Sequence, residues 1–141
     1  PPRSTLFPYT TLFRSHEAKL AGAAALTIWG SGRPRREFLH VDDLARACVF
    51  LMRNYSAPAP INVGSGQDIA IADLARLVCE VVAFDGEIRC DRSKPDGTPR
   101  KLMASDRLAA LGWQPRISLR EGIAATYTTY CEALMPGVRA A

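Results

Sequence analysis

The chain has 141 residues, 48% of them hydrophobic and 23% charged, a composition typical of one globular domain of ordinary size. Its 18 basic and 14 acidic residues leave a net charge of +4, which is too weak to indicate nucleic-acid binding by itself. No apolar run approaches the roughly 20 residues of a membrane span, so we expect no membrane partner.

Residues 1–15 contain a near-symmetric repeat. The triplet Thr-Leu-Phe occurs twice, with an Arg-Ser pair outside each copy, and the stretch has neither a helical nor a strand period. Because it resembles a translated sequencing adapter, we interpret 1–15 as a non-native segment and leave it out of the fold prediction. A genuine hairpin turning at Pro8-Tyr9 is the alternative. Residues 16–141 are then a partial domain.

The next elements are short. Residues 16–22 suit the end of a helix, and the apolar run at 26–29 predicts a strand that two glycines stop. A second extended run covers 37–41. At Asp42 the apolar spacing becomes helical, and the predicted inward face of this helix comprises Leu44, Ala47, Cys48 and Leu51.

The middle of the chain alternates strands and helices. After a Pro-rich connector at 56–60, residues 61–63 are predicted as a strand. The inward face of the following helix comprises Ile71, Leu74, Ala75, Val78 and Val82. Residues 87–90 are predicted as another strand. The Gly-Ser-Gly turn at 64–66 is too short for the G-x-G-x-x-G dinucleotide fingerprint, so we interpret it as an ordinary turn.

Two helices with recognisable ends complete the chain. Ser105 is expected to cap a helix over 106–111, and Gly112 suits the position after its end. Ser118 and Glu121 form a capping box for a last helix, with an inward face at Leu119, Ile123, Tyr127, Cys131 and Leu134. Strands alternating with helices indicate an α/β fold. The strands are too few for a self-sufficient parallel sheet, so we predict part of a larger protein.

The cysteine and histidine content argues against a zinc site. No two of the four cysteines form a C-x-x-C pair, and only two histidines are present. Cys48, Cys79 and Cys131 fall on apolar helical positions, so we expect buried free thiols. Free thiols in turn favour a reducing, cytoplasmic location.

The most informative segment is residues 93–101, SKPDGTPRK. Its two prolines bracket a turn that carries one carboxylate, and its three cations suit an anionic ligand. A second basic cluster, Arg33, Arg35 and Arg36, follows a tryptophan and two glycines. Because a guanidinium matches two phosphate oxygens at once, this cluster also suits a phosphate ligand. Solvated surface loops are the alternative for both segments.

The residues reveal no catalytic constellation. His40 has no Ser or Cys nucleophile beside it, and a structural role after a strand explains it better. Asp42 and Asp43 could form a carboxylate pair. A helix N-terminus, where carboxylates complement the helix dipole, accounts for both without chemistry.

Five motifs, in this order and spacing, resemble the GDP-L-fucose synthase family of extended short-chain dehydrogenases. They are Trp-Gly-Ser-Gly from Trp29, Arg-Glu-Phe-Leu-His-Val-Asp-Asp from Arg36, Ile-Asn-Val-Gly from Ile61, the segment 93–101, and Leu-Gly-Trp from Leu111. The second motif is shared by many nucleotide-sugar dehydrogenases, whereas the segment 93–101 is much more particular to fucose synthases. The resemblance covers roughly residues 16–135.

The resemblance implies a substrate and its contacts. The family reduces a 4-keto nucleotide sugar with NADPH after epimerising two ring carbons. An N-terminal Rossmann domain binds the cofactor, and a smaller C-terminal domain binds the GDP-sugar. By motif, Trp29 would line the nucleotide-sugar pocket, Arg36 would clamp the diphosphate, and Asp96 would accept hydrogen bonds from the substrate. Lys101 is a further candidate. Arg14 falls at a basic position of the family but within 1–15, so we treat that match as coincidental.

The chain departs from the family where chemistry is expected. It has no Gly-rich dinucleotide turn, no Tyr-x-x-x-Lys, and no cysteine matching the catalytic one. We therefore expect the C-terminal, substrate-binding part of an extended short-chain dehydrogenase (NAD(P)-binding Rossmann-like) fold, without the N-terminal Rossmann half. In that case the chain holds no catalytic residue and no NADP(H) site, although the full-length family uses NADP(H).

The partners follow from the same resemblance. A GDP-sugar is the expected substrate, nucleic acid is not expected, and a homodimer is expected for the full-length enzyme. Two other interpretations stay open: another nucleotide-sugar epimerase or dehydratase, and a non-catalytic phosphate- or nucleic-acid-binding module. Few aromatic side chains that could stack on bases lie near the arginine clusters, which disfavours the module.

Overall fold

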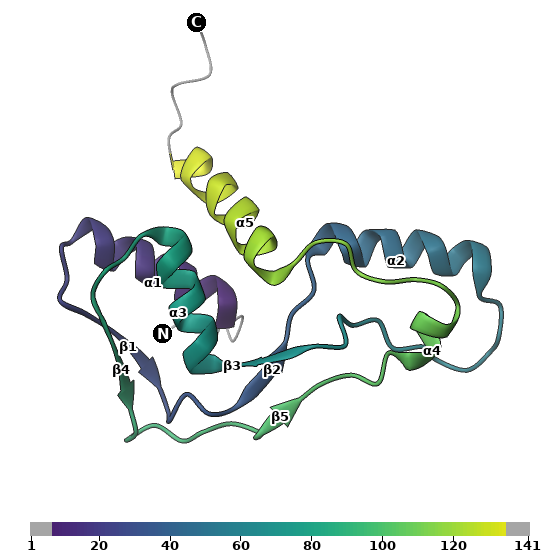
Figure 1. Cartoon of the computed structure of the whole chain (residues 1–141), viewed down its shortest axis with the longest axis horizontal. Helices are drawn as coiled ribbons and strands as arrows, with labels where there is room; N and C mark the ends of the chain where they lie inside the picture. Colours follow the sequence, from purple (N-terminus) through teal and green to yellow (C-terminus); the bar gives the residue numbers. More distant parts are fainter. Residues whose placement is uncertain (1–6, 135–141) are drawn as a thin grey trace, which may run out of the picture.

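The computed structural model describes residues 7–134, which form two small sheets and five helices (Figure 1). The elements in chain order are α1 Phe7–Leu20, β1 Ala25–Trp29, β2 Arg35–Glu37, α2 Val41–Asn54, β3 Asp68–Ala70, α3 Ile71–Val82, β4 Glu87–Asp91, β5 Arg100–Lys101, α4 Asp106–Ala110 and α5 Leu119–Leu134. The predicted α/β class is confirmed. Parts of the two predicted segments 1–15 and 16–141, namely residues 1–6 and 135–141, lie outside the described residues. No helix within the described part is long and apolar enough to cross a bilayer.

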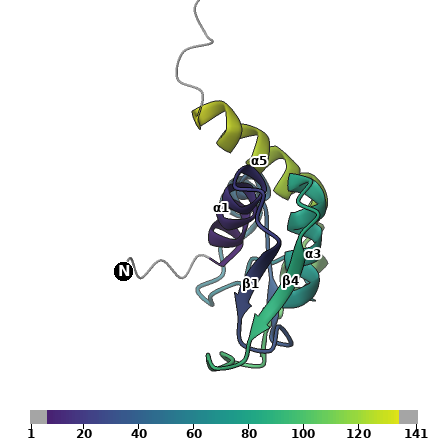
Figure 2. The ribbon, with the colours of Figure 1, turned by 90° about the vertical axis from the view of Figure 1, so that its left-hand side faces the viewer.

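Two small sheets organise the molecule. In the first sheet β1 and β4 run parallel (Figures 1 and 2). In this ladder Trp29 lies opposite Asp91. In the second sheet β2 is central, parallel to β5 and antiparallel to β3. Because β2 follows β1 and β5 follows β4, the chain passes from the first sheet to the second twice in the same direction.

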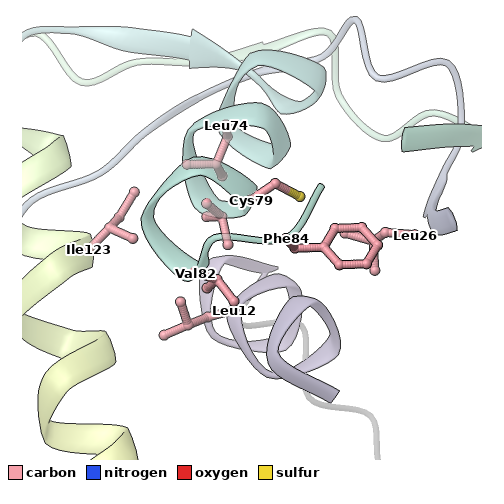
Figure 3. Close-up of a cluster of buried hydrophobic side chains, with 8 residues drawn as sticks. Leu12, Leu26, Leu74, Cys79, Val82, Phe84 and Ile123 are labelled. Carbon is pink, nitrogen blue, oxygen red and sulfur yellow. The ribbon is translucent and has the colours of Figure 1, made fainter. Parts of the chain in front are cut away.

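The main hydrophobic core lies among α1, α3, α5 and β1, as Figure 3 shows. Its buried side chains are Leu12, Leu26, Leu74, Val78, Cys79, Val82, Phe84 and Ile123. Every residue of the predicted inward face of α3 is buried, so that prediction is confirmed. Leu74 has no solvent exposure. The core therefore fixes α3, and with it the end of β3 that leads into the helix.

Residues 7–15 differ from the prediction, because the structure places them in α1 rather than in an irregular segment or a hairpin. Leu12 and Ser15 are buried, and Lys19 Nζ donates to the carbonyl of Val82 at 2.9 Å. Burial against α3 thus accounts for a helix that the sequence period does not indicate. The non-native origin of residues 1–15 stays a prediction.

The helix α2 begins one residue before the predicted start at Asp42, but its predicted inward face is only partly correct. Ala47 is fully buried in a second apolar cluster with Leu108 and Trp113. Leu44 is 43% exposed and Cys48 is exposed. The reason is that α2 packs on this cluster along one side only, so two of the four residues predicted to face inward are exposed to solvent. Exposure of Cys48 makes the expectation of a buried thiol wrong there.

Several smaller predictions are corrected. Residues 61–63 are irregular, since they find no neighbouring strand among the described elements, whereas β3 was not predicted. Ser105 makes no side-chain capping bond, and Leu134 is 52% exposed. The thiol of Cys131 is half-buried. The buried thiol of Cys79 is confirmed.

The capping box of α5 is confirmed. The hydroxyl and amide of Ser118 both donate to Glu121, at 2.6 and 2.9 Å, and the amide of Glu121 donates back to Ser118 Oγ at 3.3 Å. Such a reciprocal pair satisfies backbone donors that the helix leaves free at its first turn.

Candidate functional site

The candidate site is built from two loops that run side by side. We call residues 30–34 the β1–β2 turn and residues 92–99 the β4–β5 loop. At one end the amide of Gly30 donates to the carbonyl of Asp91 at 2.9 Å, and at the other the amide of Arg35 donates to the carbonyl of Pro99 at 2.8 Å. The ladders at both ends are parallel, so the turn and the loop run in the same direction, and one backbone hydrogen bond joins them at each end.

A carboxylate joins the turn and the loop at their centre. Asp96 Oδ1 accepts from the amide of Ser31 at 2.7 Å, and Asp96 Oδ2 accepts from the hydroxyl of Ser31 at 2.6 Å. Gly30 has a φ of +78°, and a Cβ there would lie 2.3 Å from Asp96 Oδ1. Only glycine therefore permits this close approach.

The two bonds from Ser31 also set the charge state of Asp96. The hydroxyl and then the amide of Ser31 lower the pKa of the carboxyl below its usual value, and the positive charges of Arg33 and Arg92 lower it further. Asp96 is accordingly a stable anion at neutral pH, surrounded by cations.

The β1–β2 turn is also tied to the start of α3. The carbonyls of Gly32 and Pro34 accept from the amides of Ala72 and Ile71, at 2.9 and 3.0 Å. The first two amides of α3 are thus occupied by protein carbonyls. A dinucleotide pyrophosphate needs such amides free at a helix N-terminus, so the residues at α3 do not fit NADP(H).

Within the basic clusters, Asp68 neutralises two arginines. Its carboxylate forms an ion pair with Arg35 at 2.8 Å and a second, shorter one with Arg100, while only 5% of its own side chain is exposed. These bonds, to Arg100 first and then to Arg35, lower the pKa of Asp68. Both arginines are therefore structural partners of Asp68.

Arg36 and Lys101 lie on the other face of the second sheet. They are register partners across β2 and β5, and side chains alternate along a strand. Arg36 Nη1 donates to the carbonyl of Arg35 at 2.7 Å, and Arg36 Nη2 lies 3.2 Å from the position a Cβ would take on Gly97. The Arg36 guanidinium thus reaches the β4–β5 loop.

Several cations on or beside the two loops are unpaired. Within residues 7–134, no ion pair is made by Arg33, Arg36, Arg92, Lys94 or Lys101. Lys94 Nζ lies 5.8 Å from the centre of the Trp29 ring, which is 65% exposed at the end of β1. The arrangement offers an aromatic face and several free cations to an anionic, ring-containing ligand.

The four predicted site residues lie on or beside these two loops. Trp29 ends β1 next to the β1–β2 turn, Asp96 of the β4–β5 loop is hydrogen-bonded to Ser31 of that turn, and Arg36 and Lys101 are register partners in the strands that follow the turn and the loop. Ser31 and Asp68 were not predicted as site residues from the sequence. The hydroxyl of Ser31 beside the glycines was the only available signal for the first, because both contacts join residues more than thirty positions apart.

Removing the Asp68 charge is expected to create a general polyanion-binding surface on the face of the second sheet opposite Arg36 and Lys101. In D68N, Arg35 and Arg100 lose their shared partner. For single-stranded DNA, two additional free cations should steepen the slope of log K against log salt by about 1.4. Binding measured across a salt series checks this, with R89A as a control that removes one cation. An unchanged slope would contradict the assignment of Asp68.

His40 and Asp43, which were weighed above as catalytic candidates, have structural roles. His40 caps α2, its Nδ1 accepting from the amide of Asp42 at 3.3 Å. Asp43 is fully buried and accepts from the amides of Arg116 and Ile117, at 3.0 and 2.9 Å. A cavity of about 730 Å³ lies between the start of α2 and α5, and none of the four predicted site residues lines it.

Comparison with known proteins bears out the resemblance. Residues 5–64 match the NAD dependent epimerase/dehydratase family. GDP-L-fucose synthase 1 of Arabidopsis thaliana is 58% identical over 117 residues, covering 83% of this chain and 36% of that protein. GDP-L-fucose synthase of Escherichia coli K12 is 44% identical, covering 94% of this chain and 44% of that protein. The chain thus spans less than half the length of these relatives.

Solved structures agree on the fold. A GDP-mannoheptose C4 reductase of Campylobacter jejuni with NADP bound has a TM-score of 0.78 and 32% identity, covering 92% of this chain and 46% of that one. A GDP-L-fucose synthetase of Naegleria fowleri has a TM-score of 0.84 at 24% identity, covering 91% and 40%. At that identity the second match shows the fold alone. The expected resemblance to GDP-L-fucose synthases, with an extended short-chain dehydrogenase fold, is confirmed.

Proposed function

We propose that this chain supplies the GDP-sugar-binding site of an NADP-dependent epimerase-reductase that converts GDP-4-keto-6-deoxymannose to GDP-L-fucose. The observation that carries the proposal is the placement of Trp29, Arg36, Asp96 and Lys101 on or beside the β1–β2 turn and the β4–β5 loop, in a region 58% identical to a GDP-L-fucose synthase. Arg36 and Lys101 lie side by side across the ladder and are free of ion pairs within the described residues, as a diphosphate clamp requires.

The ligand is oriented by the two loops. We place the diphosphate between Arg36 and Lys101, with the face of Trp29 against a ring of the nucleotide sugar. Asp96, held by Ser31, is an acceptor for hydroxyl or amino groups of the ligand, since each carboxylate oxygen keeps a second lone pair. Arg33, Arg92 and Lys94 add positive potential that attracts the dianion.

The chemistry is proposed to belong to the rest of a longer protein. NADP(H) supplies the hydride in that chemistry, and neither the sequence nor the occupied α3 amides of this chain fit it. The chain itself binds and orients substrate, and we propose that it does not turn substrate over alone. For the full-length enzyme we propose a cytoplasmic homodimer.

Calorimetric titration of the purified chain tests the proposal. We expect GDP to bind at least about tenfold more tightly than UDP or dTDP, because a site that hydrogen-bonds one base rejects bases with other donors and acceptors. Preference for UDP would instead support another nucleotide-sugar enzyme. Tighter binding of single-stranded DNA than of GDP would support a nucleic-acid module. Oxidation of NADPH with the keto sugar above background would overturn the proposed division of labour.

A further inference from the structure

We infer that Ser31 is a positioning residue, which fixes the Asp96 carboxylate and so holds the β4–β5 loop in the conformation that binds the nucleotide sugar. The inference rests on the proposed function and adds a residue that contacts neither phosphate nor base in it. Ser31 acts through Asp96, so its effect on the ligand is indirect.

Ser31 is held from several directions at once. Its amide and hydroxyl donate separately to the two oxygens of Asp96, at 2.7 and 2.6 Å. Its hydroxyl oxygen accepts from the amide of Arg33 at 3.2 Å, and its carbonyl accepts from the thiol of Cys90 at 3.5 Å. The side chain therefore has one defined orientation, aimed at the β4–β5 loop.

The loop has no apolar anchor of its own. All of residues 92–99 are exposed, and none belongs to a core cluster. Loops without buried contacts depend on polar ties and backbone stiffness for a fixed conformation. At the centre of this loop, the only side-chain hydrogen bonds within the described residues are the two between Asp96 and Ser31.

Along the β4–β5 loop, the hydrogen bonds from Ser31 to Asp96 lie between the two points where this loop contacts proposed ligand-binding residues. Two positions before Asp96, Lys94 lies over the ring of Trp29. One position after it, Gly97 lies against the guanidinium of Arg36. Releasing Asp96 from Ser31 therefore loosens the aromatic face and the phosphate clamp together, although Ser31 touches neither.

Three variants of the full chain test this role. S31A removes the hydroxyl bond to Asp96, and S31T keeps it. S118A is a matched control, because it removes a serine-to-carboxylate bond of the same 2.6 Å length at the start of α5. Titration calorimetry with GDP gives the dissociation constant of each variant, and thermal melts show whether S31A and S118A are equally folded.

We expect S31A to weaken GDP binding about tenfold, S31T to stay within about twofold of wild type, and S118A to leave binding unchanged. The pH profile adds a readout that general loss of structure does not move. Ser31 lowers the pKa of Asp96, so affinity is lost as pH falls through that lowered value. In S31A the acid limb of the profile should move to higher pH, while S118A keeps the wild-type limb.

The outcomes separate the inference from the proposed function. If wild type binds GDP and S31A binds it equally well, with an unmoved acid limb, Ser31 has no positioning role and the proposed function stands. If wild type does not bind GDP, the proposed function fails and the inference fails with it. Weakening in S31A that S31T does not restore also overturns the inference.

Discussion

Replacing Arg36 by alanine is expected to weaken GDP binding by about 1.5–3 kcal/mol, which raises the dissociation constant roughly ten- to hundredfold. The guanidinium reaches the β4–β5 loop, makes no ion pair within residues 7–134, and lies beside Lys101. Its charge-assisted bonds are therefore available to a diphosphate. Calorimetric titration of R36A with GDP measures the loss.

The neighbouring arginine supplies the control for this measurement. Arg35 has the same side chain one position earlier, but it lies on the opposite face of β2 and is paired with Asp68. In R35A we expect a much smaller change in GDP affinity than in R36A. An unchanged dissociation constant in R36A, or equal losses in both variants, would remove Arg36 from the site.

Replacing Asp43 by alanine is expected to lower the free energy of unfolding by about 2–4 kcal/mol. The carboxylate is fully buried at the start of α2, where it accepts from the amides of Arg116 and Ile117 and pairs with Arg46. Its removal leaves two backbone donors and one guanidinium without their acceptor. Urea denaturation of the variant and wild type gives the difference.

The pH dependence of that difference identifies the carboxylate as its source. Burial raises the pKa of Asp43, but the bonds from the two amides and from Arg46 together outweigh it, so the pKa is lowered from its ordinary 3.8. A lowered pKa in the folded state means that the stabilisation is present above the ordinary value and is lost as pH falls below it. The gap between wild type and D43A should narrow in acid. A gap that is constant down to strongly acidic pH would contradict the ionic role of Asp43.

The sequence alone predicted the elements whose pattern is local. Helix α3 has its inward residues at helical spacing, and each of them is buried. The capping box of α5 depends on two residues three positions apart. These features depend on neighbours in the chain, so composition and spacing are sufficient to find them.

The elements that the sequence did not reveal depend on distant partners. Helix α1 owes its form to burial against α3, and residues 61–63 are irregular because no described strand pairs with them. Leu44 matches the helical pattern of α2 but stays largely exposed, because the second apolar cluster covers only one side of that helix. An amphipathic pattern shows which side of a helix is apolar, not whether anything packs on it.

The candidate site divides in the same way. Trp29, Arg36, Asp96 and Lys101 were predicted from sequence motifs, and they lie on or beside the two loops that the parallel ladders hold side by side. The basic clusters could not be sorted by sequence into structural and free cations, because that depends on Asp68, which is more than thirty residues from both of its partners. Ser31 likewise depends on a contact across 65 positions.

The most direct test of the central claim is an NMR titration of the full chain with GDP, following backbone amides and the indole N–H of Trp29. If the two loops hold the nucleotide, the signals of Trp29, Ser31, Gly97 and Lys101 shift with one dissociation constant, while Gly122, beside the cavity at α5, stays in place. Shifts confined to the residues around that cavity, or no shifts at saturating GDP, would contradict the assignment of these loops as the nucleotide-sugar site.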